Sequence, residues 1–238
     1  MALEMQSTAD AFNRNCLLLD QVTSNLANAG TTGFKAERMF FQVTEGEADG
    51  EAVSFYSYAP FVRTDFTGGV SLKTGNPLDL SIQGDGFFSV ETPEGEAYTK
   101  KGNFTVNGKG EIVTVAGDPV LGESGRLVIE GQEVSVGADG TITVDETVVG
   151  KLKITGFRNE DALERAENCC FRDGGEGEPY RPGDVTVQSG FLEQSNVNVV
   201  QHMIEMIDIH RSLESYQKII QTLADQDKMS TNRIGRLA

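Results

Sequence analysis

The sequence predicts an α+β protein in which N- and C-terminal helices pair as a coiled coil and a central all-β domain is inserted between them. Apolar residues at both ends recur with coiled-coil spacing, whereas the middle consists of short segments separated by turn-forming residues. All but four of the 27 glycines, and most of the formal net charge of −16, fall in residues 46–189. We therefore expect three parts: a discontinuous helical assembly domain (1–38 and 190–238), connectors (39–75 and 158–189) and a β-domain (76–157).

The N-terminal segment has the spacing of one coiled-coil helix. Its expected seam residues recur at alternating steps of four and three: Met5, Ala9, Phe12, Cys16, Leu19, Thr23 and Leu26. This 3.5-residue period places them on one side of a helix, where a partner helix can cover them. The helix should end at Asn28-Ala29-Gly30, because Asn and Gly tolerate the left-handed conformation of a helix C-cap.

The middle of the chain predicts short antiparallel strands. Residues 104–115 and 134–144 each place a turn, Asn107-Gly108 or Asp139-Gly140, between two apolar β-forming runs. Further strands are expected at residues 78–82, 87–90, 126–129 and 150–157. Many short strands at regular spacing favour a small sandwich or barrel-like domain. Residues 44–70 and 158–189 show no clear period and are expected to be connectors.

The C-terminal segment predicts a second helix with a seam. Asn198 followed by Gln201 resembles a capping box at its start. The expected seam residues are Val199, His202, Met206, Ile209, Leu213, Tyr216, Ile220 and Leu223. Further apolar residues, Met203, Ile204, Ile207 and Ile219, widen this face beyond what one partner helix covers. Periodicity alone leaves two occupants for the extra face: other copies of the chain, or the β-domain of a compact monomer.

The acidic composition argues against anionic partners. A chain with 36 Asp and Glu against 20 Lys and Arg repels phosphate backbones and anionic lipid headgroups. No apolar run approaches the ~18 residues that a membrane span needs. The N-terminus lacks a basic start followed by an apolar block, so no cleaved secretory signal is expected. We expect no nucleic-acid partner and no membrane insertion.

Side chains that carry catalysis or bind metals are scarce. The three cysteines are Cys16 and the adjacent Cys169 and Cys170, and the two histidines are His202 and His210. At helical rise the histidines lie ~12 Å apart, too far to share a metal ion. The sequence contains neither a phosphate-binding loop nor a nucleophile elbow. It therefore predicts no enzyme, no catalytic residue, no cofactor and no metal site.

Several segments resemble one known family in chain order. Residues 24–36 resemble the signature of bacterial flagellar rod and hook proteins, and residues 74–88 with 98–104 are similar to the start of that family's β-domain. Residues 189–200 and 217–222 resemble the family's C-terminal helix at its entry and its close. The positions that carry the motif are Asn25, Leu26, Ala27, Asn28, Thr32, Gly33, Phe34, Lys35, Asn196, Val197 and Asn198.

The resemblance implies a fold and a role. Family members line an axial tube with a coiled coil of their terminal helices, carry a β-domain outside it and have no catalytic activity. They are exported by the flagellar type III apparatus without signal cleavage. Together with copies of themselves and other rod proteins they assemble, between the two membranes, into the helical tube of the basal body, which transmits torque and passes exported subunits. Within the family, residues 33–41 and 221–237 look closer to the proximal than to the distal rod type.

Two functions from other classes remain to be weighed. The first is a secreted β-domain that binds glycan or protein, with the helices serving only as an export signal. The second is an enzyme of cell-wall remodelling, which the lack of paired acidic residues and metal ligands disfavours.

Overall fold

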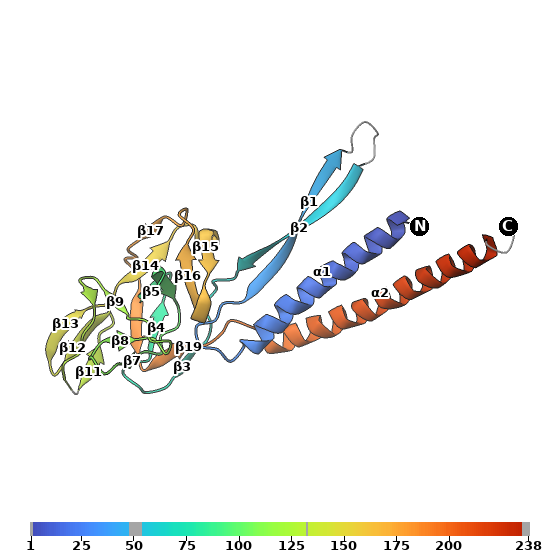
Figure 1. Cartoon of the computed structure of the whole chain (residues 1–238). Helices are drawn as coiled ribbons and strands as arrows, with labels where there is room; N and C mark the ends of the chain where they lie inside the picture. The colour runs from blue at the N-terminus through green and yellow to red at the C-terminus, as the bar shows by residue number, and fades with distance from the viewer. Residues whose placement is uncertain (1, 48–53, 132, 235–238) are drawn as a thin grey trace. The chain divides into compact units, whose positions relative to one another are not determined.

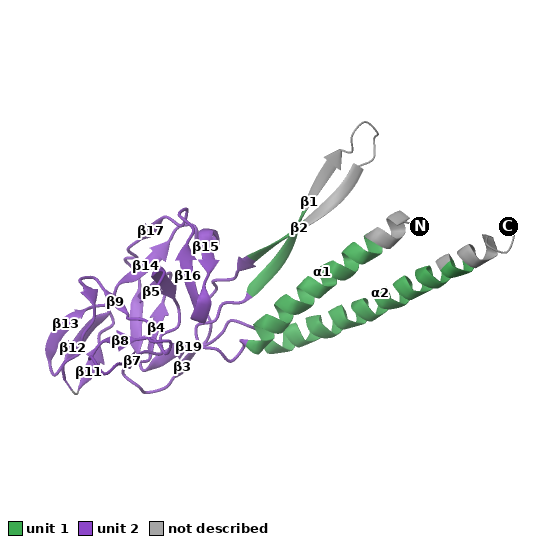
Figure 2. Cartoon of the chain, in the orientation of Figure 1, with its two compact units in different colours: residues 1–27, 37–62, 198–238 green, residues 28–36, 63–197 purple. Residues whose placement is uncertain are grey.

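The computed structural model describes residues 2–47, 54–131 and 133–234, and the chain divides into two compact units. Unit 1 comprises Met1–Ala27, Glu37–Val62 and Asn198–Ala238, and unit 2 comprises Asn28–Ala36 and Arg63–Val197 (Figure 2). The division differs from the expected parts at both connectors and at the inner ends of the expected assembly domain, since residues 28–36 and 190–197 belong to unit 2. Residues 37–62 belong to the unit that contains the helices, and residues 158–189 belong to the β-rich unit.

Unit 1 contains both terminal helices and one hairpin among its described residues. Its elements are α1 (Ala2–Ala27), β1 (Glu37–Glu47), β2 (Ser54–Thr64), whose last two residues enter unit 2, and α2 (Val199–Ile234). α1 and α2 contact each other and run in opposite directions (Figure 1). Two terminal helices with a β-rich region between them confirm the predicted α+β class. The pairing of the helices as a coiled coil remains a prediction.

The inner helix ends lie where the sequence predicts them. α1 ends at Ala27, and the C=O of Asn28 accepts a hydrogen bond from the backbone N–H of Thr31 at 3.0 Å. Neither Asn28 nor Gly30 has left-handed backbone, so the expected C-cap conformation is wrong although the position of the helix end is correct. α2 begins directly after Asn198, whose Oδ1 accepts the backbone N–H of Gln201 at 3.2 Å. This bond satisfies one of the backbone donors that have no partner within the helix, so Asn198 is the N-cap.

The largest sheet of unit 2 has six antiparallel strands in the order β15-β16-β6-β5-β14-β17. Their bounds are β5 (Phe87–Thr92), β6 (Gly95–Thr99), β14 (Ile154–Phe157), β15 (Leu163–Arg165), β16 (Cys170–Asp173) and β17 (Pro179–Tyr180). Three of these strands come from residues 158–189, so the expectation of a connector there is wrong. The strands are too short to show a period, and Asn168 and Cys169 interrupt them with left-handed backbone.

Smaller ladders surround this sheet. The pairs are β3 (Ser71–Lys73) with β19 (Phe191–Glu193), β4 (Leu80–Gln83) with β18 (Thr186–Ser189), β7 (Thr105–Val106) with β8 (Ile112–Val113), and β9 (Leu121–Gly122) with β10 (Gly125–Arg126). A three-stranded sheet joins β11 (Val134–Val136), β12 (Thr141–Val144) and β13 (Thr147–Lys151). Two short 3-10 helices, η1 (Glu160–Ala162) and η2 (Glu167–Cys169), flank β15.

Both predicted hairpins are confirmed, and their turn residues act through side chains. Asn107 Oδ1 accepts the backbone N–H of Lys109 at 2.8 Å between β7 and β8. Asp139 Oδ1 accepts the backbone N–H of Thr141 at 3.2 Å between β11 and β12. Such short polar side chains favour turns because they bond to backbone two residues ahead.

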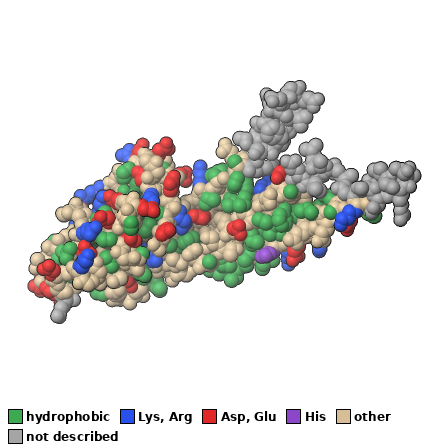
Figure 3. Space-filling model, in the orientation of Figure 1, with side chains coloured by type: hydrophobic (Ala, Val, Ile, Leu, Met, Phe, Trp, Pro, Cys, Tyr) green, Lys and Arg blue, Asp and Glu red, His purple; other side chains and the backbone are tan. Residues whose placement is uncertain are grey.

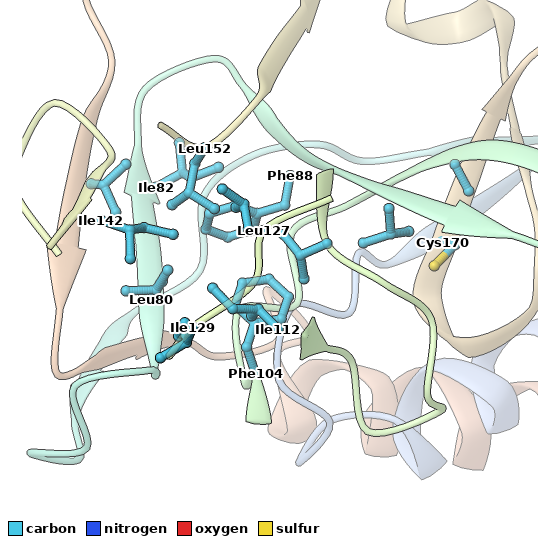
Figure 4. Close-up of a cluster of buried hydrophobic side chains, with 14 of the residues drawn as sticks. Leu80, Ile82, Phe88, Phe104, Ile112, Leu127, Ile129, Ile142, Leu152 and Cys170 are labelled. Carbon is cyan, nitrogen blue, oxygen red and sulfur yellow. The ribbon is translucent and has the colours of Figure 1, made fainter. Parts of the chain in front are cut away.

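Unit 2 has a hydrophobic core of its own. Figure 4 shows Leu80, Ile82, Phe88, Ile142 and Leu152 in one cluster of buried side chains. A second cluster contains Leu163 and three rings, Phe87, Phe157 and Phe171, which make edge-to-face contacts with Phe66 and Tyr98. Full burial of each such side chain stabilises the fold by roughly 1.5–3 kcal/mol relative to exposure.

Candidate assembly interface

α2 carries most of the predicted seam as its least exposed stripe. The predicted seam residues that are buried or half-buried are His202, Met206, Ile209, Leu213, Tyr216, Ile220 and Leu223, and the polar residues Glu205 and Ser212 beside them are half-buried as well. Leu213 is the most buried of them, with 8% of its surface exposed. Val199 extends the same spacing to the first residue of the helix but is exposed. The covered stripe therefore begins at His202, one step later than predicted.

On α1 the buried stripe lies one residue earlier than the sequence predicts. The buried side chains are Ala11, Val22 and Asn25. Of the predicted seam residues, Phe12, Cys16, Leu19 and Leu26 are half-buried, Ala9 and Thr23 are exposed, and Met5 lies outside the side chains that the structure describes. The prediction used apolar residues alone, whereas the buried stripe includes amides that have hydrogen-bond partners.

A second apolar face of α2 is exposed. Its members, which we call the outer face, are Val200, Met203, Ile204, Ile207 and Ile219. Ile204 is 56% exposed, although isoleucine is among the side chains most often buried in proteins. Figure 3 shows hydrophobic side chains grouped in patches on the visible surface of the helices. Exposed apolar patches on proteins commonly coincide with sites that bind other proteins, membranes or ligands.

The hairpin of unit 1 exposes a pair of aromatic rings. Phe40 on β1 and Phe61 on β2 stack with their ring centroids 5.5 Å apart, and both rings are exposed. Met39 and Phe41, which point to the opposite side of the strand, are half-buried. The sequence analysis missed this pair because it assigned the whole segment to a connector.

Asn25, a motif residue, ties the end of α1 to the start of β1. Its Nδ2 donates to the Glu37 C=O at 2.8 Å, and its Oδ1 accepts the Glu37 N–H at 3.0 Å. The side chain of Gln21 also donates to the Glu37 C=O. Asn25 is fully buried. Its amide forms hydrogen bonds with the backbone of Glu37 like those that a neighbouring strand would form. An aliphatic residue here would leave both backbone groups without these bonds.

Lys35, the most buried charged motif residue, forms an ion pair with Glu193 inside unit 2. The Nζ–Oε1 distance is 2.6 Å, and 1% of Lys35 is exposed. Lys35 Nζ also donates to the Thr67 C=O at 2.8 Å, and the same Glu193 oxygen accepts the Gly69 N–H at 2.9 Å. Both charges are therefore paired and hydrogen-bonded, as buried charges must be. The partner carboxylate lies 158 residues away in the chain, and the sequence analysis did not identify it.

Asn196 joins the same three chain segments through its amide. Its Oδ1 accepts the Ala36 N–H at 2.7 Å, while its Nδ2 donates to the C=O of Asp65 at 2.8 Å and of Thr67 at 3.1 Å. The Asp65 N–H in turn donates to the Ala36 C=O at 2.7 Å. Both N–H groups of this amide donate, and its oxygen accepts one hydrogen bond. Asn196 therefore holds the three backbone segments close to one another.

Arg165 of β15 contacts two motif residues, Lys35 and Phe34. Its Nη2 donates to the Lys35 C=O at 2.5 Å, and its guanidinium lies 4.7 Å from the Phe34 ring centroid. It also lies 5.4 Å from the Phe171 ring centroid, so a cation faces two aromatic rings. We call Lys35, Arg165, Glu193 and Asn196 the junction clamp.

The other motif residues lie close to these contacts along the chain. Gly33 has φ +67°, and a Cβ there would lie 2.5 Å from the Lys101 backbone nitrogen, so only glycine fits. Its N–H donates to the Glu193 C=O at 2.8 Å. The remaining positions are Ala27, exposed at the end of α1, and Asn28, Thr32 and Val197, which are half-buried. These motif residues therefore hold backbone segments of the chain together.

A polar hollow of about 970 Å³ lies beside the junction clamp in unit 2. The buried Lys100 lines it, donating from Nζ to the Gly84 C=O at 3.1 Å and lying 5.0 Å from the Phe87 ring centroid. Burial lowers the pKa of Lys100, and the carboxylate of Glu193 opposes this shift. Burial also raises the pKa of Glu160 in the same hollow. Among the described side chains, no three of His, Cys, Asp or Glu converge on a point that could hold a metal ion.

Comparisons with known proteins cover nearly the whole chain. The family described as flagellar hook protein FlgE/F/G D1 domain matches residues 81–144, and the one described as flagellar basal body rod FlgEFG protein C-terminal matches residues 188–233. The FlgF basal-body rod protein of Caulobacter vibrioides is 33% identical over 226 residues, 92% of each chain. The chain belongs to the flagellar basal-body rod protein family.

Relatives named for two members of this rod family match the chain. FlgF of Escherichia coli is 35% identical over 85% of this chain and 86% of its own. FlgG of Bacillus subtilis is 31% identical over 86% of this chain and 88% of its own. These matches confirm the family expected from residues 24–36 and the predicted class, a structural protein of the flagellar basal-body rod. Within the described residues, no helix combines the length and apolarity that a membrane crossing requires.

Proposed function

We propose that this chain is the proximal rod protein of the flagellar basal body, with the distal rod protein as the alternative. Residues 33–41 and 221–237 resemble the proximal type, and matching relatives named FlgF come from several bacteria. The match to FlgG of Bacillus subtilis keeps the distal type in view. Complementation separates the two, because the proximal assignment predicts that the chain restores motility to a strain lacking FlgF and not to one lacking FlgG.

The first step of assembly in this proposal is the pairing of α1 and α2 as a coiled coil. The covered residues of α2 keep alternating steps of four and three from His202 to Leu223, which is the spacing that such packing requires. Helices of this kind are marginal alone, so most of their stability must come from the partner that covers the stripe.

The second step is the burial of the outer face against neighbouring subunits. Complete burial of a fully exposed isoleucine contributes roughly 1.5–3 kcal/mol, and Ile204 and Ile207, which are 56% and 50% exposed, gain the corresponding part of it. Ordering a residue costs about 1–2 kcal/mol in backbone entropy, so several such contacts must form together. Head-to-tail contacts that do not close into a ring produce a helical tube. The exposed Phe40–Phe61 pair offers a further contact with a neighbour.

The same proposal also gives the partners of the chain, its location and its lack of catalytic activity. The partners are other rod proteins, copies of this chain and the flagellar type III export apparatus, and the location is the periplasmic rod, reached without signal cleavage. The chain acts without catalysis, cofactor or metal. The exposed apolar outer face carries this proposal, because it leaves a surface that a structural subunit covers by assembling.

The experiment replaces Ile207 by Glu in a strain whose own gene is deleted. The variant should fold like the parent chain, because Ile207 is 50% exposed, yet it should form no rods, since a charge would be buried without a partner. Counting basal bodies and flagella by electron microscopy gives the readout. The matched control is Gln217→Glu, an exposed position on the same helix, which should assemble normally. Normal rod numbers with Ile207→Glu would refute the proposal.

A further inference from the structure

The chain connects the two units at four places, and the junction clamp ties together the segments beside three of them. The connections follow residues 27, 36, 62 and 197. Beside the last three, segments 33–36, 63–69 and 193–197 all lie in unit 2. Lys35, Glu193 and Asn196 belong to these segments, and Arg165 contacts the first of them. The clamp therefore lies wholly within unit 2.

The three segments meet at one buried charge. The carboxylate of Glu193 binds Lys35 of the first segment at 2.6 Å and the Gly69 N–H of the second at 2.9 Å. Asn196 joins the same segments a second time. Its Oδ1 lies 2.7 Å from the backbone nitrogen of Ala36, and its Nδ2 lies 2.8 Å from the backbone oxygen of Asp65. Pulling any one segment away would leave a buried charge or amide of another without its partner, which is strongly unfavourable. The segments can therefore leave the clamp only together.

This coupling has a mechanical consequence. A single peptide connection can rotate about its φ and ψ angles within the sterically allowed regions. Backbones held side by side by shared hydrogen bonds cannot rotate independently of one another. Buried ion pairs are weak evidence for stability, since apolar residues of similar volume often replace them without loss. Their geometry, fixed by two partners for each charge, is what an apolar replacement does not reproduce.

We propose that the junction clamp is a mechanical element of the subunit, which makes three chain connections resist torsion as one body. The proposal rests on the proposed function as a rod subunit and adds a role for residues that do not lie on the assembly helices. Lys35 and Glu193 supply the central pair, Asn196 sets the spacing of the backbones, and Arg165 fastens the motif to the six-stranded sheet.

The test uses the Lys35→Met, Glu193→Leu double variant in a strain that lacks the native gene. It removes the pair without leaving an unpaired charge, so unit 2 stays folded. The matched control is Lys151→Met, which breaks an exposed ion pair with Asp139 at 3.4 Å in the same unit. Flagella are counted by electron microscopy, and swimming speed is measured in media of rising viscosity. Amide hydrogen exchange of the purified full chain reports on Ala36 and Gly69.

The double variant should show wild-type flagellar number, wild-type speed in dilute medium, and a loss of speed that grows with viscosity. Ala36 and Gly69 should exchange faster, while Lys151→Met behaves like the parent. Wild-type speed at every viscosity, unchanged amide hydrogen exchange, or absence of flagella would each overturn the proposed resistance to torsion. If the double variant yields no folded chain, Arg165→Gln carries the same test with the same readings. Flagellar number reports assembly separately, so the rod function can stand while this role fails.

Discussion

Replacing Leu213 by Ala isolates what the covered stripe of α2 contributes. Leu213 is the buried residue of that stripe, and truncating a buried leucine typically costs 2–5 kcal/mol. Helix propensity adds nothing, because Ala favours helix at least as well as Leu. Leu213 retains some exposure and its stripe neighbours are only half-buried, so we expect about 2–3 kcal/mol, the lower part of that range.

Hydrogen exchange with mass spectrometry resolves where this loss falls, because it measures local opening along the chain. Peptides from α1 and α2 should lose protection in Leu213→Ala, while peptides from β5 and β6 in unit 2 should keep theirs. Far-ultraviolet circular dichroism should show the helical signal disappearing at a lower temperature than in the parent chain.

Two leucines on the same chain give matched controls. Leu80→Ala, at a position 1% exposed in the core of unit 2, should reduce protection in the β-strands instead of the helices. Leu17→Ala, at a position 39% exposed on α1, should change little. Equal loss of protection in both units with Leu213→Ala, or no loss in the helices, would refute the reasoning.

Three further predictions follow from particular contacts. Asn25→Ala should destabilise unit 1 by about 1–3 kcal/mol, because the Glu37 N–H loses the Asn25 acceptor and the Glu37 C=O loses one of its donors while it keeps Gln21; the loss should appear as faster exchange at the start of β1. Hydrogen bonds from Thr141 lower the pKa of Asp139 from 3.8 to about 2. The stability that this ionised carboxylate contributes is therefore present above pH 3.8 and lost as the pH falls through about 2, and Asp139→Asn should remove that dependence in urea titrations. Burial raises the pKa of Cys170 to about 11, so its thiol should resist alkylation at neutral pH until the chain unfolds.

Each of these has an outcome that contradicts it. Unchanged exchange at Glu37 would show that the Asn25 amide does not hold the strand. An identical acid dependence of Asp139→Asn and the parent chain would remove the role of that turn. Rapid alkylation of Cys170 in the native chain would mean that the thiol is open to solvent.

Local chemistry explains the elements that sequence alone could predict. The turns at Asn107 and Asp139 depend on side chains that bond to backbone two residues away. Both partners of each hydrogen bond therefore lie within one short segment of the sequence. The N-cap of α2 is local in the same sense, since Asn198 bonds to the backbone of Gln201.

Nonlocal partners explain what the sequence analysis missed. Asn25 was not expected in the buried stripe of α1, because its hydrogen-bond partner is Glu37, beyond the end of the helix. Glu193 was not identified because nothing near it in the chain indicates a lysine partner at residue 35. Residues 158–189 lack a period because their strands have two to four residues each and are interrupted by left-handed backbone at Asn168 and Cys169.

The motif itself was found at the right place, yet its physical role differs from that of the helix stripes. Lys35 and Asn196 fall within the bounds expected for the helical assembly domain (1–38 and 190–238), whereas their contacts lie inside unit 2. A resemblance locates such residues because it matches letters, but only the structure shows which backbones they join.

The most direct test of the assembly claim is site-specific photocrosslinking in isolated basal bodies. A photoreactive amino acid replaces Ile204 on the outer face, and another replaces the exposed Gln217 as a control. Position 204 should yield covalent adducts with neighbouring rod subunits, identified by mass spectrometry, and position 217 should yield far fewer. Assembled rods that give no intersubunit adduct from position 204 would contradict the account.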